Sequence, residues 1–109
     1  MIKGILVKPG SKPEVIEFSE GYRSLQKLVE GTFEMPAFFD DADIIINDEG
    51  KLNGSPANKF VLFDGQLVDV IFGNIVITDS DENGKTISLS EDKIQKYLKI
   101  FSRDVINLP

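Results

Sequence analysis

An oxygen-rich segment, DSDENGKT, has the residue types of a calcium-binding loop. Asp79, Asp81 and Asn83 stand at the first, third and fifth positions of such a loop, and Gly84 follows at the sixth, where a sharp turn is needed. The twelfth position holds Ser90 in place of a bidentate glutamate, and the residues before the segment have the pattern of a strand. A hairpin turn is therefore the favoured interpretation, and weak calcium binding at Asp79, Asp81 and Asn83 is the alternative.

Three acidic residues in the segment FFDDAD have the chemistry needed for acid–base catalysis. Asp40, Asp41 and Asp43 lie beside aromatic residues, but general acid catalysis needs one carboxyl group with a raised pKa next to another that stays ionised. Consecutive acids in a turn are usually solvated. An enzyme that uses these carboxylates is therefore the weakest hypothesis, and we expect the protein not to be an enzyme.

The segment NDEGKLNGSPANKF, residues 47–60, is the best candidate for a binding site. The triplet DEG and the pair NG predict two successive turns, because glycine and asparagine tolerate positive φ. Ordered loops held by rigid strands often carry binding groups. The candidate ligand-binding residues are Asn47, Lys51, Asn53, Ser55, Asn58 and, further along the chain, Gly73. The alternative is that these side chains cap turns and satisfy the loop backbone.

Composition limits the classes of function. The chain has 109 residues, of which 41% are hydrophobic and 28% charged, which predicts one globular domain over residues 1–109. Its net charge of -6 opposes binding to nucleic acid and to anionic membranes, so we expect neither as a partner. Cysteine and histidine are absent, which excludes disulfides, Cys/His zinc sites and triads with a histidine base. We expect no cofactor and no metal.

The sequence also predicts where the protein resides. The apolar segment at the N-terminus is too short for a signal peptide, and no run approaches the roughly 18 apolar residues of a membrane span. We therefore expect a soluble, cytoplasmic protein.

Periodicity predicts the elements that position these segments. Strands are expected over residues 2–7 and in PEVIEFS, TFEMPAF, DADIIIN, KFVLF, QLVDVIFGNIVIT and TISLS. Apolar residues at three- and four-residue spacing predict a helix from Tyr22 to Val29, with Gly31 at its C-terminal cap. A second helix is expected after Ser90 as N-cap. This order predicts an α+β fold, with a mixed or mostly antiparallel sheet and two amphipathic helices packed on one face.

The middle strands hold more aromatic residues than one face of a small sheet needs. These residues are Phe33, Phe38, Phe39, Phe60, Phe63 and Phe72. We expect them to form the core, and the alternative is that some form a dimer surface. The sequence leaves both a monomer and a homodimer open.

Several stretches give the chain a family resemblance. NDEGKLNGSPAN, DVIFGNIVI, SLSEDKIQKYLKIF and LQKLVEGTFE resemble the small bacterial and phage proteins of a domain of unknown function, DUF3846. The similarity spans nearly the whole chain. The Gly-x-Pro-x-Asn pattern of that family is matched by Gly54, Pro56 and Asn58, whereas Ala57 replaces a second proline and Asn74 replaces a threonine. The resemblance implies a small accessory protein from phage, plasmid or Gram-positive genomes, and it implies no particular activity.

Two hypotheses of different classes follow. The first is a non-enzymatic accessory protein, from a phage or other mobile element, that binds and modulates a host protein, because the chain is acidic and poor in catalytic residues. The second is a protein that binds a small polar, nucleotide-like ligand through the loop from Asn47 to Asn58 and the region near Gly73. Lys51 and Lys59 are the cations near this loop that would bind phosphate.

Overall fold

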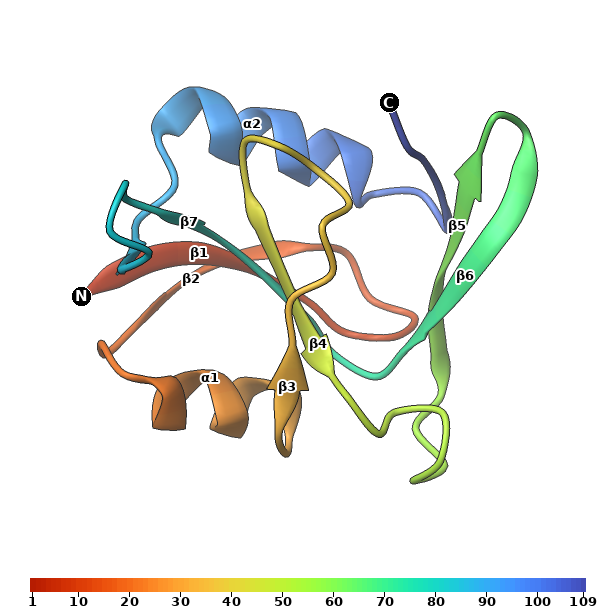
Figure 1. Cartoon of the computed structure of the whole chain (residues 1–109), viewed down its shortest axis with the longest axis horizontal. Coiled ribbons are helices and arrows are strands. Elements are labelled where there is room, and N and C mark those ends of the chain that lie inside the picture. Colours follow the sequence, from red (N-terminus) through yellow and green to blue (C-terminus); the bar gives the residue numbers. More distant parts are fainter.

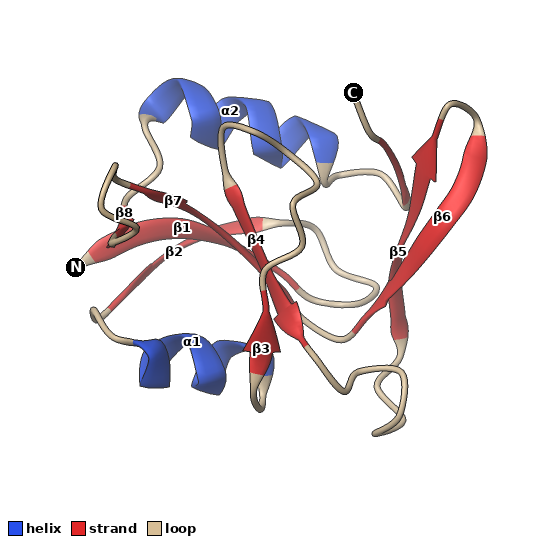
Figure 2. Cartoon of the chain, in the orientation of Figure 1, coloured by secondary structure: helices blue, strands red, loops and turns tan.

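The computed structural model describes all 109 residues and contains two sheets and two helices (Figures 1 and 2). In chain order the elements are β1 (Ile2–Val7), β2 (Glu14–Phe18), α1 (Tyr22–Val29), β3 (Phe33–Glu34), β4 (Asp43–Asn47), β5 (Ala57–Phe63), β6 (Gln66–Phe72), β7 (Ile75–Ser80), β8 (Thr86–Ile87), α2 (Glu91–Ile100) and β9 (Val105–Asn107). The predicted α+β class is confirmed. Neither helix is long and apolar enough to cross a membrane.

The larger sheet has six strands, and every pairing within it is antiparallel. Its order is β2-β1-β7-β4-β3, and β8 pairs with the end of β7. The central strands are buried on both faces, since the consecutive residues Ile44, Ile45 and Ile46 of β4 are all buried. Successive side chains of a strand point to opposite faces. A continuous apolar run of this kind therefore needs cover on both faces of the sheet.

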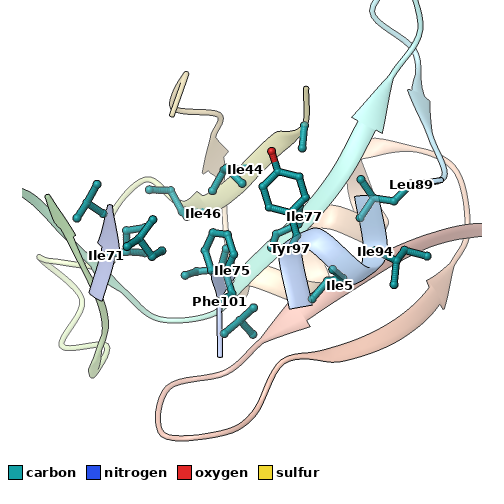
Figure 3. Close-up of a cluster of buried hydrophobic side chains, with 14 residues drawn as sticks. Ile5, Ile44, Ile46, Ile71, Ile75, Ile77, Leu89, Ile94, Tyr97 and Phe101 are labelled. Carbon is teal, nitrogen blue, oxygen red and sulfur yellow. The ribbon is translucent and has the colours of Figure 1, made fainter. Parts of the chain in front are cut away.

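The two helices supply that cover from opposite faces. Ile44 belongs to a cluster with Tyr97 of α2 and Phe101 at the end of that helix (Figure 3). Ile45, the next residue of β4, belongs to a second cluster with Leu25 of α1. In Figure 1, α2 lies above the sheet and α1 below it. The prediction that both helices pack on one face is wrong, because the central strands are apolar on both faces.

The smaller sheet has three strands, in the order β6-β5-β9, and β5 and β9 are parallel. Asp64 and Gly65 connect β5 to β6 with φ angles of 51° and 76°, as a two-residue hairpin turn with two left-handed central residues requires. Its inner face packs onto the α2 side of the core through Val61, Ile71 and Ile106. Figure 1 shows both helices beside the larger sheet, away from the β5–β6 hairpin.

Local predictions are confirmed in part. Ser90 caps α2, because its hydroxyl accepts the N–H of Lys93 at 3.3 Å. The left-handed residue after α1 is Glu30, with φ 64°, and not Gly31. The run QLVDVIFGNIVIT forms two strands in different sheets, separated at Gly73, whose φ is 83°. TFEMPAF and TISLS contribute only the two-residue strands β3 and β8.

The aromatic residues divide between the core and the surface. Phe38 and Phe39 pack against the cluster under α2, and Phe33 packs against the cluster under α1. Phe60 and Phe63 are exposed. The prediction of a core role is therefore confirmed for Phe33, Phe38 and Phe39 and wrong for Phe60 and Phe63. Phe72 is half-buried.

Candidate functional site

Asn47 fixes the end of α1. Its side chain is buried, its Nδ2 donates to the carbonyl of Val29 at 3.0 Å, and its Oδ1 accepts the N–H of Glu49 at 2.7 Å. A Cβ at Gly31 would stand 2.7 Å from this Nδ2. The glycine expected as a helix cap is therefore required by the approach of Asn47. Both polar atoms of the Asn47 side chain are used by the fold.

Asn58 joins the two sheets. From β5, its buried Nδ2 donates to the carbonyl of Val7 in β1 at 2.9 Å and to the carbonyl of Gly73 at 2.7 Å. Its Oδ1 is buried and has no hydrogen-bond partner. Because buried carbonyls need donors, Asn58 acts first as a structural link between β5, β1 and the segment before β7.

Three of the candidate residues do lie together. Asn53, Ser55 and Gly73 line a surface cavity of about 410 Å³, together with Asn74 and Glu30 at the end of α1. Glu30 is the one charged residue of the lining, which contains no lysine or arginine, while Asn47 and Asn74 donate to the carbonyls of Val29 and Leu28 at the end of α1. This cavity suits a neutral or cationic polar ligand and is unsuited to a phosphate group.

Lys51 lies in a separate groove of about 310 Å³ between β6 and the end of β4. Its ammonium group is 2.8 Å from Oδ1 of Asp69, and the same oxygen accepts the N–H of Val70 at 2.8 Å. The predicted set is thus divided between a cavity, a groove and the interior. The loop from 47 to 58 passes over different neighbours along its length, and the spacing of its residues carries no sign of this division.

Lys59 points to the inner face of the smaller sheet. Its side chain is only 4% exposed and forms no ion pair. Burial lowers the pKa of the ammonium group, and the carboxylate of Asp104 partly opposes this effect. Lys59 lines neither the cavity at Asn53 nor the groove at Lys51, and its role in binding phosphate stays a prediction.

Of the three aspartates of FFDDAD, Asp41 connects the loop before β4 to α2. Asp41 accepts hydrogen bonds from the hydroxyl of Tyr97 and from the ammonium of Lys96, the latter at 2.8 Å. The bond from Lys96, and then that from Tyr97, holds the pKa of the Asp41 carboxyl below its usual value. Burial, and then the bond to Asp41, raises the pKa of the Tyr97 hydroxyl. Asp40 is exposed, and one oxygen of Asp43 is buried without a partner.

Asp79 and Asp81 of DSDENGKT use carboxylate oxygens in contacts within the fold. Oδ1 of Asp81 accepts the N–H groups of Asn83 and Lys85, both at 2.9 Å, which closes the hairpin turn. Oδ2 of Asp79 is 2.7 Å from the ammonium of Lys93. The structure contains no group of three acidic side chains placed to hold a metal ion. The hairpin interpretation is confirmed.

The surface that sequence reasoning missed is the outer face of the smaller sheet. We define the outer face by its apolar residues Phe60, Leu62, Leu67, Val70 and Val105. The register pairs Phe60 with both Val70 and Val105, and Leu62 with Leu67, and directly paired residues of neighbouring strands share a face. Phe60, Leu67 and Val105 are exposed, and the other two are half-buried. The excess of aromatic residues was the available signal, but it does not show which face lacks cover.

Comparisons with known proteins identify a family and no close neighbour. The family model described as "Domain of unknown function (DUF3846)" matches residues 2–102, which include every element except β9. No curated protein matches the chain, and no solved structure matches it. The resemblance seen in the sequence is confirmed.

Proposed function

The chain belongs to the DUF3846 family, and on this premise we propose that it is a non-enzymatic protein that binds another protein through the outer face. The carrying observation is a sheet face with apolar residues on all three strands and no helix against it. Monomeric proteins rarely expose a contiguous apolar patch larger than a few hundred Å². A patch of this kind is typical of a protein interaction site.

The size of the patch supports a specific interface. Phe60 is 42% exposed, Leu67 58% and Val105 39%, and the flanking residues Phe63 and Val68 are 52% and 54% exposed. Phe63 directly follows Leu62 in β5 and so points to the opposite face. Since a large side chain has roughly 150–250 Å² of surface, Phe60, Leu67 and Val105 together present on the order of 250 Å² of apolar surface on the outer face. A standard interface buries about 800 Å² on each partner, so the patch is large enough to be its apolar centre.

Charge favours a different protein over a second copy of the chain. The chain carries a net charge of -6, and two copies brought together would repel each other. Asp64 stands at the turn beside the outer face and Asp104 stands before β9. A partner with an apolar centre and basic groups around it would be complementary to this surface. Together with the resemblance to phage proteins, this supports an accessory role in which the chain modulates a host protein.

The test compares two triple variants. The outer-face variant is Phe60→Thr/Leu67→Thr/Val105→Thr, and the control is Val15→Thr/Met35→Thr/Ile87→Thr, which removes exposed apolar residues outside the outer face. Proteins retained from host lysate are identified, purified and titrated against each chain. We expect a partner whose affinity falls at least tenfold for the outer-face variant and is unchanged for the control. If the parent, the outer-face variant and the control retain the partner equally, binding occurs at another surface. If the parent forms a homodimer that only the outer-face variant loses, the outer face binds a second copy of the chain and not a different protein.

A second candidate function rests on the cavity that Asn53, Ser55 and Gly73 line. Its volume of about 410 Å³ is within the range of small-ligand sites, and its electrostatics favour a neutral or cationic polar ligand. Thermal melting in the presence of nucleosides and polyamines tests this function. We expect stabilisation of the parent chain that is lost in Asn53→Ala, whereas stabilisation by nucleotides alone would contradict the assigned ligand chemistry.

A further inference from the structure

A groove runs along the free edge of the smaller sheet. We call it the edge groove: β6 forms one wall through residues 69–72, Glu34, Ile46 and Asn47 form the other, and the turn after β4 closes one end. In the strand order β6-β5-β9, β6 has a partner on one side only. The groove therefore lies where another strand would pair with β6 at Val70, whereas the turn at Gly50 already stands against the carbonyl of Phe72, at the closed end.

Main-chain geometry shows which groups face the edge groove. The N–H of Phe60 donates to the carbonyl of Asp104 at 2.8 Å, so the main-chain groups of Phe60 point toward β9. Those of its neighbour Val61 then point toward β6, where Val61 is paired with Asp69. Val70 follows Asp69, so its N–H and C=O point away from β5. They are a donor and an acceptor at the free edge.

The side chain of Asp69, and not a neighbouring strand, accepts the N–H of Val70. Oδ1 of Asp69 accepts the N–H of Val70 and also the ammonium of Lys51, each at 2.8 Å. Charged side chains at edge strands protect them from unwanted pairing. The Lys51 side chain is well exposed, and exposed ion pairs contribute little. Another cation can therefore replace Lys51 at Asp69, and a paired strand would take over the N–H of Val70 from the Asp69 carboxylate.

The lining of the edge groove combines acidic and apolar groups. Glu34 and Asp48 are exposed and form no ion pair, and Asp69 adds a third carboxylate against the single cation of Lys51. The apolar lining residues are Ile46, Leu52, Val70, Ile71 and Phe72. A ligand complementary to this lining carries both apolar and basic side chains.

We propose that the edge groove binds an extended segment of a partner protein, with apolar and Lys or Arg side chains, that adds to β6 as a strand. A basic side chain of the segment takes the place of Lys51 at Asp69, and the N–H and C=O of Val70 pair with the segment backbone. This inference rests on the proposed function, since the same partner would also cover the outer face, which continues into the groove at Val70.

Charge makes a second copy of the chain a poorer ligand for the edge groove than a basic segment. The strand QLVDVIF carries one charged residue, and that residue is acidic. If two β6 strands paired, each would bring a further carboxylate and no cation to the acidic groove. A basic segment from another protein fits the groove better.

The test selects random twelve-residue peptides displayed on phage against the immobilised chain, and then measures the affinity of each enriched synthetic peptide. We expect peptides that contain both apolar and basic residues. Val70→Pro removes the N–H that faces away from β5, its bond to Asp69 and one side chain of the outer face, and the outer-face variant is the control for the loss of that side chain. Val70→Pro should weaken the peptides at least tenfold. The exposed pair Glu34→Gln/Asp48→Asn should weaken them about threefold or more, and Lys51→Met should tighten binding, because it removes the competing cation.

Controls separate the failure of this inference from the failure of the proposed function. The outer-face variant should bind the enriched peptides as the parent does, and urea unfolding checks that Val70→Pro is folded. If no peptide is enriched, if the peptides lack basic residues, or if Glu34→Gln/Asp48→Asn and Lys51→Met leave their affinity unchanged, the inference is overturned. The capture experiment with the outer-face variant is independent of all three results. If the outer-face variant loses the captured partner but the peptide results fail, the proposed function is supported and the added strand is not.

Discussion

The two sheets of this protein are built from similar residues and end in different environments. The strands of the larger sheet are covered by α1 on one face and by α2 on the other. The smaller sheet is covered on its inner face only, although β5 and β6 together contain as many aromatic and β-branched residues as β4 and β7. The sheets differ in cover because the chain has only two helices. One lies on each face of the larger sheet, so no helix remains to cover the outer face of the smaller sheet.

This difference separates stability from function. An apolar side chain between a helix and the larger sheet stabilises the fold through burial, at roughly 25 cal/mol per Å². An apolar side chain on the outer face remains in contact with water and contributes little to the free energy of unfolding. Its presence is better explained by a binding role, and substitutions on the two faces of one strand can test that explanation.

The largest expected effect is on the inner face of β6. Ile71 is buried in the core cluster under α2, and Ile71→Thr removes apolar contacts and buries a hydroxyl without a partner. We expect the free energy of unfolding to fall by about 3 kcal/mol, measured by urea denaturation. A loss below about 1 kcal/mol would mean that the inner face is not part of the core, and the contrast between the faces would be broken.

The junction between the sheets should be nearly as sensitive. Asn58→Ala leaves the buried carbonyls of Val7 and Gly73 without their donor, while it also removes an acceptor that has no partner. We expect a loss of about 2 kcal/mol in urea denaturation. Ser55→Ala, in the same loop but without a bond between the sheets, is the control and should change stability by less than about 0.5 kcal/mol. Equal losses would assign the effect to the loop and not to the junction.

A smaller effect of opposite sign is expected at Lys59. Burial places the pKa of this ammonium below its unfolded value of 10.5, so the charged form costs stability at every pH below the folded pKa. Lys59→Met should therefore stabilise the protein by about 1 kcal/mol at neutral pH. The gain should shrink as pH rises through the folded pKa and vanish above 10.5. A gain that stays constant up to pH 11 would attribute the effect to packing alone.

The sequence predicted the helices and strands better than it predicted which face of a sheet each helix packs against. Ser90 as N-cap and the hairpin turn in DSDENGKT depend on neighbours close in the chain, and both are confirmed. The face on which each helix packs depends on the order of the strands, which local periodicity does not contain. The run DIIIND contains the one local indication of this arrangement, since three consecutive buried isoleucines require cover on both faces.

The candidate site shows the same limit. The residue types of the loop suggested both turns and binding groups, and the structure assigns Asn47 and Asn58 to the fold and leaves Asn53 and Ser55 at a cavity. These assignments depend on Val29 and Val7, which are 18 and 51 residues away in the chain. No spacing rule within the loop can supply such partners.

The smallest effect on stability is expected on the outer face of β6. Leu67→Thr repeats the substitution made at Ile71 on the same strand, but the Leu67 side chain is already 58% exposed, and threonine is well suited to strands. We expect the free energy of unfolding to change by less than about 0.5 kcal/mol, while affinity for the partner falls. A loss in urea denaturation that approaches the loss for Ile71→Thr would show that the outer face stabilises the fold. The outer face would then be part of the architecture, and the reason to assign it to a partner would be gone.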